Sequence, residues 1–234
     1  MYQNVEIINS VEHKNKAVKE IKSLASTKEM ISAPISFTEF YEACRDFPIF
    51  FAKDAQGEWF ATALLGYNNK NMFVDDSGKW KTGAYIPAFI RRYPFILVKT
   101  DGEDEKNPNY TLAVDKECLE DATESNKERA LYDNDEPSKL SKGAMDFLIE
   151  LNSTAEATKG FIKDLEDWGV LVAQTASMVD KEGNTHNLNG FFTVNEEKMA
   201  HLGEKKKIDM CNKGALPLIT AHLISLGNIR RIGL

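Results

Sequence analysis

Short turns rich in Asp and Gly, set between β-prone apolar runs, constrain the fold of this chain most. The first such turn is Asp54-Ala55-Gln56-Gly57, and a second is Asp76-Ser77-Gly78. Asp accepts hydrogen bonds from its own turn and Gly adopts the positive φ that closes it, so each turn favours a β-hairpin. With two further pairs of runs, they predict four hairpins: 48–53 with 58–67, 71–75 with 79–81, 95–100 with 110–115, and 170–179 with 186–194.

Two short segments in the first half of the chain show helix signals instead. Ser36-Phe37-Thr38-Glu39 has the capping-box pattern, in which Ser and Glu satisfy each other's free backbone N–H groups at a helix start. After Gly83 the apolar period changes from two to about 3.6, and residues 85–93 predict a second short helix. Pro94 ends that helix, because proline cannot continue the helical hydrogen bonds.

The second half of the chain predicts a larger group of helices. Apolar stripes run through 140–151 and 161–168, and a second capping-box pattern, Ser153-Thr154-Ala155-Glu156, lies between them. These signals predict an antiparallel helical hairpin that Gly169 ends as a C′ glycine. Further helices are predicted at 196–202, in a segment ending near 214, and at 216–226.

The order of these elements indicates the fold class. Hairpins supply most of the strands and the helices gather towards the end of the chain, which is typical of the α+β class with a largely antiparallel sheet. A length of 234 residues fits one domain. We therefore expect a single α+β domain over 1–234, with a C-terminal group of helices and a weak internal boundary near 133–139.

Composition excludes several classes of protein. The net charge of −7 predicts no basic surface for nucleic acid. No apolar run approaches the roughly 18–20 residues that span a bilayer, and the first residues lack the apolar part of a secretory signal. Three cysteines make no disulfide framework, which favours a reducing compartment. We expect a soluble cytoplasmic protein that is not transmembrane and has no nucleic-acid partner.

Local motifs for metals, cofactors and catalysis are missing from the sequence. No two of the four histidines lie within five residues of each other, and neither a Cys-x-x-Cys nor a His-Glu-x-x-His motif occurs. A Gly-x-Ser-x-Gly nucleophile motif and a glycine-rich phosphate loop are missing too. Local spacing therefore predicts no metal, no cofactor and no catalytic residue.

Residues 83–95 hold the densest group of side chains suited to recognition. The polar members of this group are Tyr85, Arg91, Arg92 and Tyr93. Guanidinium groups bind carboxylates through two parallel hydrogen bonds, and Tyr, Phe and Arg dominate the anchors of partner-binding surfaces. The segment thus predicts a carboxylate or partner site. The alternative is a packing helix whose arginines pair with Asp75 or Asp76.

Six motifs follow one another along the chain. They are Asn9, Ser10 and His13 of an N-S-x-x-H pattern, Arg45-Asp46-Phe47-Pro48-Ile49, Ala63-Leu64-Leu65-Gly66, Asn71-Met72-Phe73-Val74-Asp75 with Gly78 and Trp80, residues 85–95, and Ala221-His222-Leu223 with Ser225-Leu226-Gly227-Asn228. Their order resembles that of the SapC family, which is named for bacterial surface-array (S-layer) loci. The resemblance covers nearly the whole chain, and its most specific part is the R-R-Y-P-F block. The similarly named permease of peptide transporters spans membranes and is a different protein.

The resemblance implies an association with surface-layer biogenesis or its locus, and no established reaction. Family members also occur beside outer-membrane receptors, cupin-like oxygenases and flavin halogenases, which implies an accessory role. Our first hypothesis is a non-catalytic accessory or binding protein of the surface-layer or receptor pathway that recognises a peptide, protein or carboxylate ligand. Its candidate site residues are Tyr85, Arg91, Arg92, Tyr93, Asp46, Asp75, His13 and His222.

The alternative hypothesis is an enzyme that acts on a carboxylate-bearing substrate at a site assembled from distant segments. An arginine of the pair 91 and 92 would bind the carboxylate, and proton transfer would fall to Asp46, Asp75, His13 or His222. A structural component of the surface layer itself is disfavoured, because the sequence shows no N-terminal signal. Catalysis requires a pocket that encloses an arginine, a carboxylate and a histidine. The sequence leaves the ligand and the oligomeric state open.

Overall fold

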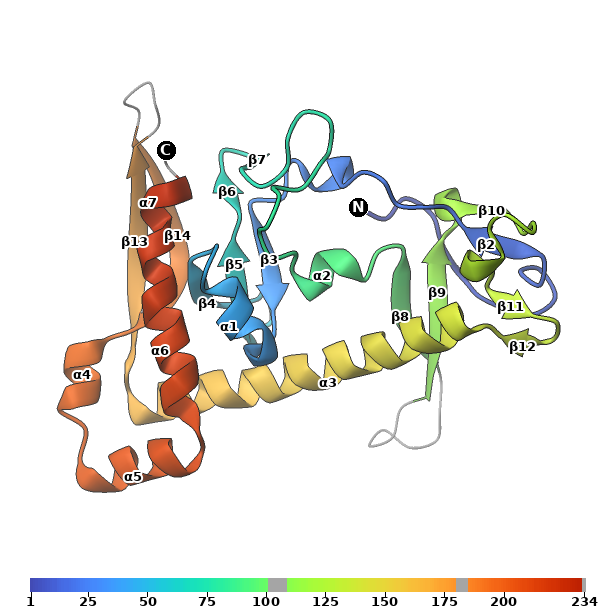
Figure 1. Ribbon diagram of the computed structural model, residues 1–234. Coiled ribbons are helices and arrows are strands. Elements are labelled where there is room, and N and C mark those ends of the chain that lie inside the picture. The colour runs from blue at the N-terminus through green and yellow to red at the C-terminus, as the bar shows by residue number, and fades with distance from the viewer. Residues whose placement is uncertain (101–108, 180–184, 233–234) are drawn as a thin grey trace. The chain divides into compact units, whose positions relative to one another are not determined.

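The computed structural model describes residues 1–100, 109–179 and 185–232 (Figure 1). The chain forms two compact units, of which the first comprises 1–22 and 90–152 and the second 23–89 and 153–234. Both units combine antiparallel strands with helices, so the predicted α+β class is confirmed. A single domain that contains both units stays a prediction.

The first unit is built on a three-stranded antiparallel sheet in the order β1–β9–β8. Strands β8 (Phe95–Thr100) and β9 (Asn109–Asp115) form one of the predicted hairpins, whose loop 101–108 lies outside the described residues. Strand β1 (Val5–Ile7) pairs with the other edge of β9. The unit also contains two two-stranded ribbons, β2 (Lys16–Val18) with β10 (Leu119–Asp121) and β11 (Tyr132–Asp133) with β12 (Glu136–Pro137). Its two 3-10 turns are η3 (Lys116–Cys118) and η4 (Lys127–Arg129).

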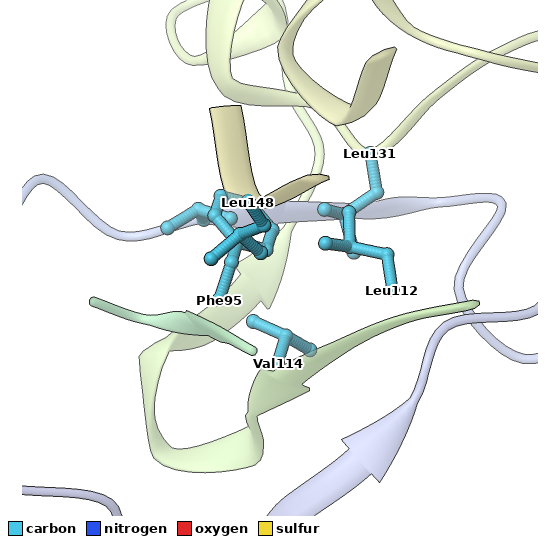
Figure 2. Packing of buried hydrophobic residues seen from close by; sticks show 6 residues of the cluster. Phe95, Leu112, Val114, Leu131 and Leu148 are labelled. Atoms are coloured by element: carbon cyan, nitrogen blue, oxygen red, sulfur yellow. The ribbon is translucent and has the colours of Figure 1, made fainter. Parts of the chain in front are cut away.

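Apolar side chains from these strands and from helix α3 (Lys139–Trp168) form the core of the first unit. The buried members are Val18, Phe95, Leu112, Val114, Leu131 and Leu148. Figure 2 shows Leu148 of α3 in this cluster together with Phe95 of β8 and residues of β9. Burial of these side chains holds the beginning of α3 against the sheet, since removal of apolar surface from water is the main force that favours packing.

Helix α3 is one continuous helix of 30 residues (Figure 1). The predicted antiparallel helical hairpin is therefore wrong. Ser153 lies in the helix interior, where the capping-box pattern has no free helix end to satisfy, and no proline or glycine with positive φ interrupts the helix there. The helix does end at the expected position, because Gly169 adopts a φ of 80° directly after it.

The second unit contains a five-stranded antiparallel sheet in the order β13–β14–β4–β5–β3. Strands β4 (Ile49–Lys53) and β5 (Trp59–Leu64) form one predicted hairpin, and β13 (Leu171–Val179) and β14 (Thr185–Val194) form another. Strand β3 (Ser32–Ile35) pairs with β5, and β14 pairs with β4. The two sequence hairpins are thus neighbours in one sheet.

The hairpin predicted for 71–75 with 79–81 forms only around its turn. Val74 and Trp80 make one antiparallel bridge, and main-chain hydrogen bonds from Asp75 N–H and Lys81 N–H lie on either side of it. Instead, Asn71 belongs to a two-stranded ribbon of β6 (Gly66–Tyr67) and β7 (Lys70–Asn71), where it pairs with Gly66. The first residue of the predicted strand is therefore already paired with an earlier segment.

Both short helices of the first half are present, with different lengths from those predicted. The capping box is confirmed, since Ser36 N–H donates to the Glu39 carboxylate, and the helix begins as a 3-10 turn, η2 (Phe37–Glu39), followed by α1 (Phe40–Ala43). Helix α2 covers only Ala88–Arg91. The residues before α2 are held by side chains, because Tyr85 N–H donates to Asp46 and the Tyr85 carbonyl accepts from Trp80.

The predicted C-terminal group of helices is present in the second unit. Its members are α4 (Glu196–Ala200), α5 (Glu204–Asn212), α6 (Ala215–Ser225), η5 (Leu226–Asn228) and α7 (Ile229–Ile232). A separate 3-10 turn, η1 (Ala25–Thr27), lies near the start of the unit. Helix α6 contacts β14 and β4. Within the described ranges, no helix has both the length and the apolar character needed to cross a membrane.

Candidate functional site

A cavity of about 590 Å³ lies in the first unit, beside the turn that connects α2 to β8. Arg91, Arg92 and Tyr93 contribute to its wall. The first turns of α3 contribute Lys139, and the turn η4 contributes Glu128. Three cationic groups and one carboxylate therefore border this space, together with apolar side chains of α3 and β8.

Both guanidinium groups of the block lie near aromatic rings. The Arg91 guanidinium carbon is 5.5 Å from the centroid of the Phe147 ring, and that of Arg92 is 5.8 Å from the Tyr2 ring. These distances fit cation–π contacts. Arg92 also hydrogen-bonds with Tyr2, whose hydroxyl donates to the Phe95 carbonyl at 2.7 Å. Burial raises the pKa of Tyr2 although the nearby guanidinium opposes this shift. The rings thus hold both charges at the cavity wall.

Tyr93 borders the cavity, and its hydroxyl is bound inside the first unit. The hydroxyl donates to Asp115 Oδ2 at 3.1 Å and accepts from the Cys118 thiol at 3.0 Å. Burial raises the pKa of Tyr93, and Cys118 and Asp115 add to the shift. Burial also opposes ionisation of Asp115, but hydrogen bonds from the N–H groups of Gln3 and Asn4 keep its pKa below the ordinary value. The Asp115 carboxylate therefore ties the N-terminal segment to β9, and the Tyr93 hydroxyl binds the same carboxylate.

His13 closes a turn in the first unit. Asn9 N–H donates to His13 Nδ1 at 3.3 Å, so the ring proton resides on Nε2, which donates to Glu6 Oε1 at 3.0 Å. The hydrogen bond from His13 is the main cause that lowers the pKa of Glu6, and Lys116 adds to it. Both imidazole nitrogens are used, so the N-S-x-x-H motif is a local structural device.

His222 is fully buried in the second unit, between α6 and the sheet. Its Nδ1–H donates to the Ile49 carbonyl at 2.9 Å, and its Nε2 accepts from Val194 N–H at 3.1 Å. Burial lowers the pKa of His222 to about 4, so the ring is neutral at pH 7. Ser225 accepts from Ile49 N–H, and Asn228 donates to carbonyls of the same segment. The motif at residues 221–228 thus binds the R-D-F-P-I segment at residues 45–49.

Asp46 and Tyr85 meet in the second unit. Tyr85 N–H donates to Asp46 Oδ2 at 2.8 Å, and its hydroxyl donates to Glu39 Oε1 at 2.9 Å. The same Glu39 carboxylate accepts from Ala88 N–H at 2.8 Å and from Ser36 N–H at 2.9 Å. Although Glu39 is buried, main-chain and side-chain donors satisfy both of its oxygens. This network positions the segment that precedes α2.

Asp75 caps its own turn in the second unit. Its Oδ1 accepts from Ser77 Oγ at 2.6 Å, from Ser77 N–H and from Lys79 N–H. The Ser77 side chain is the main cause that lowers the pKa of Asp75. These contacts are those of an Asx turn, for which Asp is preferred.

The cavity thus brings together three of the eight predicted site residues, Arg91, Arg92 and Tyr93. The other five take part in hydrogen bonds within their own units. Sequence reasoning missed Lys139, Glu128 and Gly143. Lys139 begins α3 with no acidic residue in the first turn, and Gly143 lies in the helix interior, but neither feature places its residue beside Arg91.

Gly143 also offers a prediction about stability. A Cβ built at Gly143 or at Gly160, in the same helix, meets nothing within 4 Å. Because glycine in a helix interior costs about 1 kcal/mol relative to alanine, Gly143→Ala and Gly160→Ala are each expected to raise the free energy of unfolding by about 1 kcal/mol. Urea denaturation followed by circular dichroism measures both. A loss of stability at either position would contradict the open space beside it.

The fold and the site define a mixed α+β protein with a cationic cavity next to its R-R-Y-P-F block. The SapC family model matches residues 8–232, and the chain belongs to the SapC family. Comparisons with curated proteins and with solved structures found no match. Among the described residues, no three His, Cys, Asp or Glu side chains are placed to hold a metal ion.

Proposed function

We propose that this chain is a non-catalytic accessory protein that binds a carboxylate-bearing peptide or protein in the cavity beside Arg91 and Arg92. The observation that carries the proposal is the lining of this cavity by both arginines. The planar guanidinium matches the geometry of a carboxylate and can donate two parallel hydrogen bonds to it.

The remaining lining suits a ligand that also has an apolar part. Leu140, Ala144 and Phe147 face the cavity from α3, and Phe95 borders it from β8. Binding pockets for organic ligands combine such apolar walls with a few convergent polar groups. Charge and apolar surface together favour an amphipathic carboxylate over a simple inorganic ion.

The placement of the histidines favours binding over catalysis. No histidine is among the described residues that line the cavity. His13 and His222 each use both ring nitrogens in hydrogen bonds elsewhere in their own units. A general base must reach the proton that it removes, and these rings are already engaged.

The partner in this proposal belongs to the surface-layer or outer-membrane receptor pathway of a bacterium, and the protein acts in the cytoplasm. Membership of the SapC family supports the pathway, because the family takes its name from surface-array loci. The three cysteines, which make no disulfide framework, support a reducing compartment.

A titration with 3-phenylpropionate, a small acid with an aromatic ring, tests the binding site. We expect 3-phenylpropionate to shift amide NMR signals of the cavity residues, whereas its neutral amide binds at least about tenfold more weakly. Arg91→Gln is expected to weaken binding of the acid by about tenfold, because a charge-assisted hydrogen bond contributes about 1.5–3 kcal/mol.

Arg45→Gln is the matched control, since Arg45 is exposed, lies in the second unit and pairs with Glu42. This variant is expected to bind the acid as the wild type does. Thermal melts of both variants separate lost binding from lost stability, because Arg91 also packs on Phe147. If neither a small acid nor a peptide acid binds in a manner that depends on Arg91, the proposed function is wrong.

A further inference from the structure

We infer that the cavity beside Arg91 receives the C-terminal residue of a polypeptide, with the free α-carboxylate against its cations and a large apolar side chain against α3. The inference rests on the proposed function and narrows its ligand. Three properties of the lining support it: the charge at the start of α3, the gap at Gly143, and the size of the cavity.

The start of α3 carries positive charge that no acidic residue in the first turn of the helix balances. Lys139 is the first residue of the helix, and the first turn contains no acidic residue. The helix macrodipole adds partial positive charge at the same end, where Asp or Glu is normally preferred. In the described part of the chain, the Lys139 ammonium has no ion pair or side-chain hydrogen bond. An anion bound in the cavity would supply the missing negative charge.

The gap at Gly143 supplies room for an apolar side chain. Gly143 lines the cavity between Leu140 and Phe147, and a Cβ at this position would meet nothing within 4 Å. Glycine is unfavourable in a helix interior, so its position here opens the wall at a cost to the helix. Ala144 continues the same apolar surface. A ligand side chain therefore finds both space and apolar contacts next to the cations.

The size of the cavity favours a chain end over an internal segment. A volume of about 590 Å³ lies within the roughly 300–1,000 Å³ typical of small-ligand pockets. A C-terminal residue carries a carboxylate and a side chain on one Cα, and the rest of the polypeptide leaves the cavity in one direction only. Glu128, which has no partner among the described residues, can accept the N–H of the preceding residue. That last contact favours a polypeptide over a small free acid.

The test compares four probes by NMR titration of the full chain. They are the tripeptide acetyl-Ala-Ala-Phe with a free carboxylate, the same peptide as its C-terminal amide, 3-phenylpropionate, and inorganic phosphate. We expect the free-acid peptide to bind at least about tenfold more tightly than each of the other three. Lys139→Gln is expected to weaken binding of this peptide by about threefold to tenfold.

Gly143→Leu and Gly160→Leu form a matched pair within one helix. Both replace an open helical glycine, but only Gly143 lines the cavity. We expect Gly143→Leu to weaken binding of the free-acid peptide at least about fivefold and Gly160→Leu to change it less than about twofold. Thermal melts of both variants test whether they fold, so that lost binding is separated from lost stability.

Each contrary outcome has a defined meaning. Equal binding of the amide, equal binding of 3-phenylpropionate, tighter binding of phosphate, or an unaffected Gly143→Leu variant would each overturn the inference. Binding of 3-phenylpropionate that depends on Arg91 would leave the proposed function intact in all these cases. Failure of every carboxylate probe would overturn the proposed function as well.

Discussion

Acidification from pH 7 to pH 4 is expected to lower the free energy of unfolding by about 3 kcal/mol through His222 alone. Burial lowers the pKa of His222 from the ordinary value of 6.5 to about 4. Below pH 6.5 the unfolded chain binds a proton that the folded chain does not yet accept, so unfolding becomes more favourable. This loss develops between pH 6.5 and about 4 and is absent above pH 7.

Urea denaturation of the wild type and of His222→Gln at pH 7, 6, 5 and 4 isolates this effect. The variant is expected to be less stable at pH 7, because Val194 N–H or the Ile49 carbonyl loses its partner. On acidification it should lose about 3 kcal/mol less than the wild type. His201→Gln is the control for the substitution itself, since His201 is exposed. Parallel pH profiles for the wild type and His222→Gln would contradict a neutral buried ring.

Glu39→Gln is expected to reduce the free energy of unfolding by about 3 kcal/mol. The carboxylate accepts from Ser36 N–H, Ala88 N–H and the Tyr85 hydroxyl, and it is buried. Glutamine has the same shape, but its NH₂ group would face at least one of these donors. A buried N–H without an acceptor costs about 1–3 kcal/mol, and loss of the charge weakens the remaining bonds.

Chemical denaturation at pH 7 measures this loss against Glu42→Gln in the same helical segment. Glu42 is exposed, and its carboxylate pairs with Arg45 across one turn, with no other partner among the described residues. Surface pairs of this kind contribute little, so the control is expected to change stability by less than about 0.5 kcal/mol. Similar losses in the two variants would show that the Glu39 network does not stabilise the fold.

The hairpins could be predicted because their information is local. In β4–β5 the turn residues and the strand residues lie within a short stretch, and Asp54 accepts N–H groups of its own turn as expected. The helical hairpin failed for the opposite reason. The capping-box pattern at Ser153 has meaning only at a helix end, and burial of Leu148 before it and Leu165 after it keeps the helix continuous.

The candidate site was predictable only in part. The block around Arg91 was recognisable because its residue types are unusual together. Lys139 and Gly143 lie far along the chain from Arg91, so their place at the same cavity could not be inferred from spacing. The role of His222 was hidden as well, since its two partners are 28 and 173 residues away in sequence.

The amino-acid sequence alone therefore determined the α+β class, three of the hairpins and the SapC family of this protein, because turns, alternation and ordered motifs are properties of neighbouring residues. Only the tertiary structure decided which polar residues stabilise the fold and which border open space. Asp46 and His222 form hydrogen bonds with main-chain groups that are distant in sequence, and His13 bonds to the Glu6 side chain within its own turn region. The cavity beside Arg91 exists because packing of α3 against the sheet leaves volume there, and volume between distant segments has no signature in the order of residues.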